Sequence, residues 1–382
     1  MQFLEPIRKK IDFKYLEFLY LLGLLLYTIK VITRLSTILD LPDSIGDLLY
    51  SLSFYLLIPK IVLNRYEKKD YIICVSTLVL GFYIYHFKHT SILSIIPLAL
   101  AGLKGSDIRK IIKMIFVITV TFVAIHTIGY FVEHFMNGGT WSNIPFFNRD
   151  WQTRNTVLCK DNNDYETLSS LAIMEFIYLT DRNKKWFLKL IFLGLLAFGF
   201  YAIGTSRTSF LVALLALPFL FLEKIKYFDK LLRYTTIIVF VVTVVLSVSF
   251  LFIDLNQRIP NYINWVANGR VELSQQAVER YGFSLLPQYE EFKNDPYSIV
   301  VDNLVDYLIL CDGIIYTVGL FVFSFYLIIN VDDPLINYYI DIMCVWCLTE
   351  RFIIFVTLAF VPLLVIHYNY SLKKKKIDEQ NN

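Results

Sequence analysis

The sequence predicts an all-α integral membrane protein that crosses the bilayer about twelve times. The 382 residues are 56% hydrophobic and 16% aromatic, and the mean hydropathy is +0.55. Many apolar runs approach the ~20 residues that a helix needs to cross the hydrocarbon. Lipid cannot hydrogen-bond the backbone, so spans must be helices or a closed barrel. The apolar runs are continuous rather than alternating, which excludes a barrel. We expect one polytopic domain over residues 1–382.

The first apolar run follows the basic stretch RKKIDFK and has no small-residue cleavage site, so it is expected to be an uncleaved anchor. The later runs are separated by basic segments or by polar turns. In order, the expected spans cover residues of about 15–33, 45–63, 70–86, 90–103, 110–131, 165–180, 186–203, 207–222, 234–253, 301–329, 335–349 and 352–370.

The basic residues predict the orientation of these spans, because cytoplasmic loops are enriched in Lys and Arg. With the N-terminus inside, six inner segments hold four basic residues each, which is 24 of the 36 in the chain. Only the inner turn NVDDP at 330–334 carries none. Both termini are therefore expected in the cytoplasm.

Two long segments fall on the outer face, 132–164 and 254–300. Loops longer than about 12–15 residues tend to be functional or disordered. Both segments are rich in aromatic residues, which favours ordered, functional loops. Within the second, VELSQQAVERYG is predicted to form a short amphipathic helix, because Leu273, Ala277 and Tyr281 share a stripe. Such a helix could lie on the membrane surface.

A polar turn of four residues, GTSR at 204–207, is expected between the seventh and eighth spans at the outer face. Arg207 could simply extend into the headgroups, as amphipathic side chains do. However, many other polar residues are expected at the same face. They include Arg149, Arg154, Asn163, Arg258, Arg270, Arg280, Glu350 and Arg351. Guanidinium groups bind phosphate oxygens with two hydrogen bonds and stay charged, so this face suits a ligand with an anionic head and a lipid tail.

The segment VDNLVDYLILCDG opens the tenth span. Asp302 and Asp306 are four residues apart and share one helix face, with Asn303 beside them and Gly313 ten residues after Asn303. An alternative reading makes Asp302 an N-cap and Asp306 a favourable acidic residue in the first turn. The spacing of CVWC at 344–347 is typical of metal or redox sites. Because partner residues are missing, we expect ordinary membrane cysteines and no metal. The sequence carries no nucleic-acid signature.

The chain resembles the Wzy-type polysaccharide polymerases, which assemble capsule or O-antigen repeat units, and more distantly the O-antigen ligases. Four elements carry the resemblance, in the same order and on the outer face. They are TRNTVLCKDNND, GTSRTSFLVALLAL, NGRVELSQQAVERYG and VDNLVDYLILCDGIIY. The ligases have a His where this chain has Asp302, followed by an Asn, Ser or Gln that precedes a Gly by the interval seen here between Asn303 and Gly313. The acidic residue favours a polymerase.

The resemblance implies a GT-C-like membrane glycosyltransferase of the bacterial cytoplasmic membrane, with its site facing outward. It would move a growing chain from undecaprenyl pyrophosphate to a newly flipped, lipid-linked repeat unit, and a flippase and a chain-length regulator are possible partners. Because pyrophosphate is a competent leaving group, positive charge matters more than a proton donor, and no cofactor is expected. The acceptor hydroxyl could need a base.

Each expected site residue has a role in this scheme. The catalytic pair is Asp302, which orients or deprotonates the acceptor, and Arg207. The expected substrate-binding residues are Arg154 and Arg270 for the pyrophosphates, Asn163 and Asn303 for sugar hydroxyls, and also Arg280, Glu350 and Arg351.

Three alternatives stay open. The first is an O-antigen ligase-type transferase. The second is a flippase or another carrier, because such proteins also often have twelve helices and because Glu17, Lys30, Glu175 and Asp341 fall within spans. Carriers place polar residues at mid-membrane on broken helices, whereas the polar residues here cluster at outer ends. The third is an unrelated membrane enzyme such as an acyltransferase.

Overall fold

The computed structural model shows an all-α protein. It describes residues 13–380 except 89–90, 141–156, 161–162, 181–184, 205, 223–224, 226, 267–268, 289–298, 300 and 349–359. The chain divides into two compact units, each built from several separate stretches of sequence. Unit 1 comprises residues 1–65, 105–226 and 357–360, and unit 2 comprises residues 66–104, 227–356 and 361–382.

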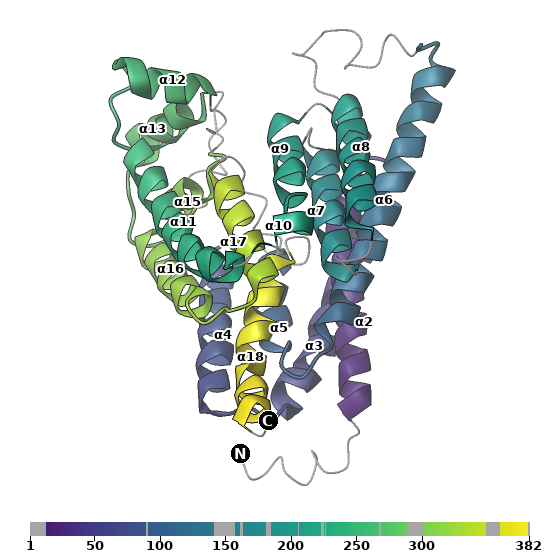
Figure 1. The fold of residues 1–382 in the computed structure, drawn as a ribbon, viewed down its shortest axis with the longest axis vertical. Coiled ribbons are helices and arrows are strands. Elements are labelled where there is room, and N and C mark those ends of the chain that lie inside the picture. The colour runs from purple at the N-terminus through teal and green to yellow at the C-terminus, as the bar shows by residue number, and fades with distance from the viewer. Residues whose placement is uncertain are drawn as a thin grey trace. The chain divides into compact units, whose positions relative to one another are not determined.

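The described residues of unit 1 form seven helices. They are α2 (Phe13–Arg34), α3 (Asp43–Leu63), α6 (Ile108–Met136), α7 (Asp164–Leu179), α8 (Trp186–Gly204), α9 (Arg207–Ala216) and α10 (Phe219–Leu222). Helices α2 and α3 pair, and α7 contacts α6, α8 and α9 (Figure 1). Most residues of α7 are buried, from Tyr165 to Ile177. Helix α7 is therefore the central helix of this unit.

Unit 2 contains the remaining described elements. They are α4 (Lys68–Lys88), α5 (Ser91–Ala101), α11 (Phe228–Phe250), α12 (Arg258–Val266), α13 (Arg270–Tyr281), α15 (Leu304–Tyr307), the π-helical turn η3 (Leu308–Asp312), α16 (Ile314–Ile328), α17 (Pro334–Cys347) and α18 (Val361–Gln380). Helix α4 pairs with α5, and α11 pairs with α17 (Figure 1). A small core of Ala277, Val301, Leu310 and Cys311 joins α13 to η3.

Local chemistry explains where several helices begin. Asp107 caps α6, since its carboxylate accepts the backbone N–H groups of Arg109 and Lys110 at 3.1 and 3.3 Å. Asp333 caps α17 in the same way, and Pro334 follows it at the first helical position. Such caps satisfy backbone donors that have no partner within the helix.

Among the residues that the structure describes, five helices are long and apolar enough to cross a membrane: α2, α3, α6, α8 and α11. The apolar helices therefore indicate a membrane-embedded protein, while the number of twelve spans and their orientation stay predictions. Each of the twelve expected windows overlaps a helix in the part of the chain that the structure describes.

Two of these windows are interrupted. The expected span 207–222 divides into α9 and α10 just before Pro218, whose ring nitrogen cannot donate a helical hydrogen bond. The expected span 301–329 divides at Gly313, between the turn η3 and α16. A continuous helix was expected in both places because the residues around Pro218 and around the Asp312–Gly313 pair are mostly apolar.

Candidate functional site

The structure brings two of the expected site residues into contact. In unit 2, Nε of Arg270 donates to Oδ2 of Asp302 at 3.2 Å. The Arg270 side chain is 11% exposed and that of Asp302 is 27% exposed. This partly buried ion pair joins the first residue of α13, in the long segment 254–300, to the residue just before the N-cap of α15.

Asn303 fixes the backbone next to this ion pair. Its side-chain oxygen accepts the backbone N–H groups of Val305 and Asp306 at 2.9 and 3.2 Å, so Asn303 is the N-cap of α15. Its amide nitrogen donates to the Ser247 hydroxyl of α11 at 3.0 Å. The alternative interpretation had made Asp302 the N-cap, whereas the N-cap is the next residue, Asn303. Asp302 contacts Arg270 instead.

A second carboxylate lies in the first turn of α15. Asp306 is buried, and neither of its carboxylate oxygens has a hydrogen-bond partner among the described residues. Ser274 of α13 lies close enough to interact with the Asp306 side chain. An ionised carboxylate without partners is costly to bury. The chain therefore keeps a polar group at this end of α15 although its burial is unfavourable. Such groups are typical of functional sites in membrane proteins.

The break at Gly313 is held by the segment that follows α13. The backbone N–H groups of Ile314 and Ile315 donate to Ser284 and Leu285 at 3.0 and 3.3 Å. The Gln288 side chain donates to the carbonyls of Gly282 and Leu310 at 3.1 and 2.7 Å. Gly313 has φ of +83° and ψ of 157°, a conformation that essentially only glycine adopts. The break is therefore supported by specific hydrogen bonds from a second segment.

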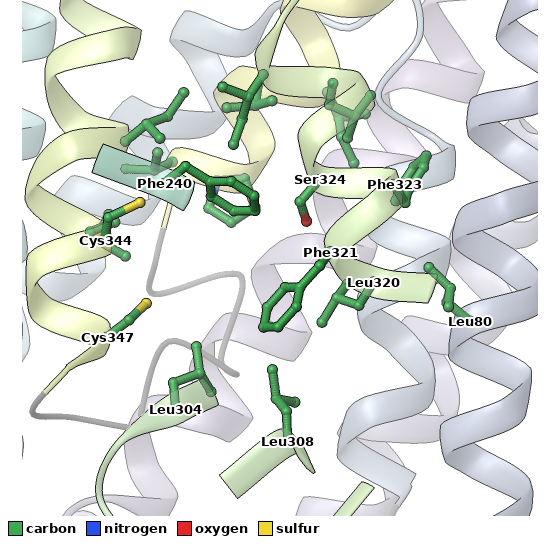
Figure 2. A pocket seen from close by; sticks show the side chains of 18 of the residues that line it. Leu80, Phe240, Leu304, Leu308, Leu320, Phe321, Phe323, Ser324, Cys344 and Cys347 are labelled. Atoms are coloured by element: carbon green, nitrogen blue, oxygen red, sulfur yellow. The ribbon is translucent and has the colours of Figure 1, made fainter. Parts of the chain in front are cut away.

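An apolar cavity of about 340 Å³ lies beside this broken helix in unit 2. Figure 2 shows Phe240, Leu304, Leu308 and Phe321 around it, with the Ser324 hydroxyl on one wall. Its lining also includes Cys344 and Cys347, the two cysteines of the CVWC motif. Six separate stretches of sequence contribute to the lining of this cavity, so the cavity is not apparent from any single motif.

Asp312 provides an acidic group on the wall of the cavity. It is the last residue of η3, immediately before the break, and only 2% exposed. Tyr83 of α4 and Tyr316 of α16 stack with ring centroids 5.8 Å apart, and both lie close enough to Asp312 to interact with it electrostatically. No role was predicted for Asp312 from the sequence. The feature that could have identified it is an acidic residue next to a glycine inside an otherwise apolar run.

In unit 1, a buried glutamate binds the backbone next to Arg207. The carboxylate of Glu166, in the first turn of α7, accepts the backbone N–H of Ser206, the N-cap of α9. Ser170 donates to the carbonyl of Ser209 at 2.8 Å, which adds a second bond between α7 and α9. Arg207 is the first residue of α9 and is exposed. The glutamate, which the sequence analysis did not identify, therefore determines where Arg207 lies.

The other expected site residues are placed as follows. Asn163 is the N-cap residue of α7 in unit 1, where its carbonyl accepts the N–H of Thr167 at 2.9 Å. Arg280 is exposed near the C-terminal end of α13. It is ten residues from Arg270, a separation of about 15 Å along the helix, so α13 does not bring the two arginines together. Arg154, Glu350 and Arg351 lie outside the described residues.

Arg207 and Asn163 belong to unit 1, whereas Arg270, Asp302 and Asn303 belong to unit 2. The meeting of Arg207, Arg154 and Arg270 in one cavity thus stays a prediction. No protein-family model, curated protein or solved structure matches this chain. Its function is therefore argued from its own residues and their geometry.

Proposed function

We propose that this chain is a membrane glycosyltransferase that polymerises oligosaccharide repeat units carried on undecaprenyl pyrophosphate. The observation that carries the proposal is the contact between Arg270 and Asp302. It places a phosphate-binding type of side chain next to a candidate base, in a chain whose apolar helices indicate a membrane protein. The four sequence elements that resemble the Wzy-type polymerases support the same assignment.

The proposed reaction is a single displacement at the anomeric carbon of the growing chain. The bond from this carbon to the pyrophosphate oxygen breaks, and a bond to the acceptor hydroxyl oxygen forms. The hydroxyl proton passes to Asp302, and lipid pyrophosphate leaves with the bonding electrons. Arg270 stabilises the negative charge that develops on the leaving group. A guanidinium has five N–H donors, so one side chain can bind a carboxylate and a phosphate oxygen together.

Arg207 is proposed to bind the second lipid pyrophosphate, with Arg154, Glu350 and Arg351 in supporting roles. Its exposure at the start of α9 is compatible with ligand binding, and the N-terminus of a helix favours anions. The bond between Glu166 and the backbone of Ser206 would hold this helix end in place when substrate binds. The protein is proposed to work at the outer face of the bacterial cytoplasmic membrane, beside a flippase and a chain-length regulator.

The decisive experiment uses purified protein in proteoliposomes with its lipid-linked repeat unit. A polymerase gives a ladder of products, whereas a ligase makes one addition to a different acceptor. We expect Arg207→Ala, Arg207→Lys, Arg270→Lys and Asp302→Asn to abolish the ladder without preventing membrane insertion. Arg34→Lys is the matched control, because Arg34 is an exposed arginine outside the proposed site. A normal ladder from the Arg207 variants would remove this residue from the mechanism.

A charge-swapped pair separates a catalytic from a structural role. The double variant Arg270→Asp/Asp302→Arg can remake the ion pair, so it should recover thermal stability relative to either single variant. If the pair acts in the reaction, the double variant stays inactive, because the candidate base and the phosphate-binding group have exchanged places. Recovery of the ladder would show that the pair has only a structural role.

A carrier of lipid-linked oligosaccharide is the second candidate function. The observation that favours it is the broken helix at Gly313, with Asp312 facing a cavity, since carriers use discontinuous helices at their binding sites. In the same proteoliposomes, a carrier would move the labelled substrate to the other leaflet chemically unaltered.

A further inference from the structure

Helix α12 in unit 2 is attached to α13 through one buried polar side chain, that of Asn264. Asn264 is buried, and its side-chain oxygen accepts the backbone N–H of Glu272 at 3.1 Å. Its amide nitrogen donates to the Glu272 carboxylate at 3.4 Å, and its carbonyl accepts the N–H of Gly269 at 2.8 Å. Asn264 therefore fastens α12 to the first turn of α13 and satisfies a backbone donor there that has no partner within the helix.

The apolar side of α12 faces away from the protein. Ile259, Tyr262 and Trp265 are 72%, 64% and 71% exposed. The rings of Tyr262 and Trp265 stack with centroids 5.8 Å apart. Within the described part of the chain, these three side chains have no apolar cover, and an isolated helix of nine residues is not stable in water. An apolar surface over this side would stabilise the helix.

The connections of α12 place it at the end of a helix of membrane length. Helix α11 has 23 residues, a length of about 34 Å that matches the hydrocarbon thickness. Gln275 of α13 donates to the carbonyls of Phe250 and Ile253, both at 2.8 Å, at the C-terminal end of α11. Through Asn264 and Gln275, α12 is thus tied to the point where α11 leaves the hydrocarbon.

The turn between α11 and α12 has the character of a segment in water. Asp254 is exposed, and its pKa is lowered because the backbone and side chain of Asn256 donate hydrogen bonds to its carboxylate. Helix α11 is long enough to cross the hydrocarbon, and the turn after it has the character of a segment in water. The headgroup region therefore lies where α11 ends and this turn begins. Trp and Tyr are enriched at this depth, and basic residues such as Arg258 interact with lipid phosphates there.

We propose that α12 docks on the bilayer surface, with Ile259, Tyr262 and Trp265 inserted at the boundary between headgroups and acyl chains. The partner is the lipid surface itself, and the inference does not depend on the proposed enzymatic activity. One consequence concerns Arg270, the first residue of α13. Because Asn264 holds the start of α13, the docked helix α12 sets the height of Arg270 near the lipid phosphates.

The test measures tryptophan quenching in proteoliposomes of phosphatidylcholine and phosphatidylglycerol that contain brominated phosphatidylcholine. The chain has five tryptophans, so the signal of Trp265 is the difference between the wild-type protein and Trp265→Phe. We expect this difference signal to be quenched by lipid bromines near the glycerol and to resist aqueous iodide. The matched control is Trp265→Phe/Gln257→Trp, which moves the indole to an exposed position in the turn before α12. Its signal should be quenched by iodide and not by brominated lipid.

Two outcomes would overturn the proposal. The first is a Trp265 signal that iodide quenches and brominated lipid does not. The second is protection of Trp265 by a lipid-free oligosaccharide, which would make the stacked rings a sugar-binding surface. A second measurement covers the case in which a substitution perturbs folding. Backbone hydrogen exchange in residues 258–266 of the wild-type protein should be slower in lipid nanodiscs than in a short-chain detergent, and equal rates would also contradict lipid docking.

Discussion

At the scale of single residues, Gly204 lies in close contact with the buried side chain of Glu166. A Cβ added at Gly204 would lie 2.7 Å from Cγ and 2.9 Å from Cδ of Glu166. The same carboxylate binds the backbone N–H of Ser206. The small residue at 204 thus allows the glutamate to reach the backbone before α9, where Arg207 begins the helix.

We expect Gly204→Ala to lower the stability of the protein by about 1–3 kcal/mol, as overpacking usually does. Gly199→Ala in the same helix is the matched control, since a Cβ there meets nothing within 4 Å. In a helix interior, replacing Gly by Ala raises the free energy of unfolding by up to about 1 kcal/mol. Thermal unfolding in detergent, followed by tryptophan fluorescence, measures both. Equal unfolding temperatures for the two variants would show that Glu166 is not held against Gly204.

At the scale of elements, most helices could be predicted, whereas their interruptions could not. Continuous apolar runs identify helices because each run is long enough to bury or to cross hydrocarbon. The break at Gly313 depends on Ser284, Leu285 and Gln288, which are more than twenty residues away in the sequence. Nothing in the local pattern of the run announces such a partner. The same reason applies to the contact between Arg270 and Asp302, which are 32 residues apart.

The amphipathic helices illustrate the limit of periodicity. The stripe in VELSQQAVERYG predicts a helix on the membrane surface, and the structure confirms the helix as α13. However, Val271 and Ala277 are buried against the protein. Large exposed apolar side chains belong to α12 instead, and the sequence analysis predicted no helix there. A pattern indicates that one side of a helix is apolar, and the tertiary contacts decide what covers it.

The broken helix gives a prediction at the element scale. A Cβ at Gly313 would lie 2.6 Å from the carbonyl carbon of Leu286 and 2.8 Å from the carbonyl oxygen of Leu285. These are backbone atoms, and φ is +83°, so Gly313→Ala should destabilise the protein by about 2 kcal/mol or more. Gly319→Ala in α16 is the control, because its nearest neighbour is a Leu80 side-chain atom at 3.6 Å. Unfolding temperatures distinguish them, and a Gly313→Ala variant as stable as the control would contradict the docked break.

For the whole molecule, the central question is which face of the membrane each segment occupies. The bias of basic residues predicts that 132–164 and 254–300 lie outside and that 330–334 lies inside. Alkaline phosphatase fused after Asn256 should be active, whereas the same fusion after Asn330 should be inactive. Green fluorescent protein fused to the C-terminus should fluoresce. The opposite pattern would place Arg270 and Asp302 in the cytosol and remove the basis for a reaction with flipped, lipid-linked substrates.

A short antiparallel bridge joins two distant stretches of sequence in unit 1. Ser36 and Cys159 form an antiparallel bridge, in which Thr37 donates to Leu158 at 2.9 Å and Lys160 donates to Leu35 at 2.8 Å. The chain is thereby clamped to the end of α2 shortly before α7 begins. Cys159 is 1% exposed, so the rate at which its thiol is alkylated is a built-in gauge of how often the clamp opens.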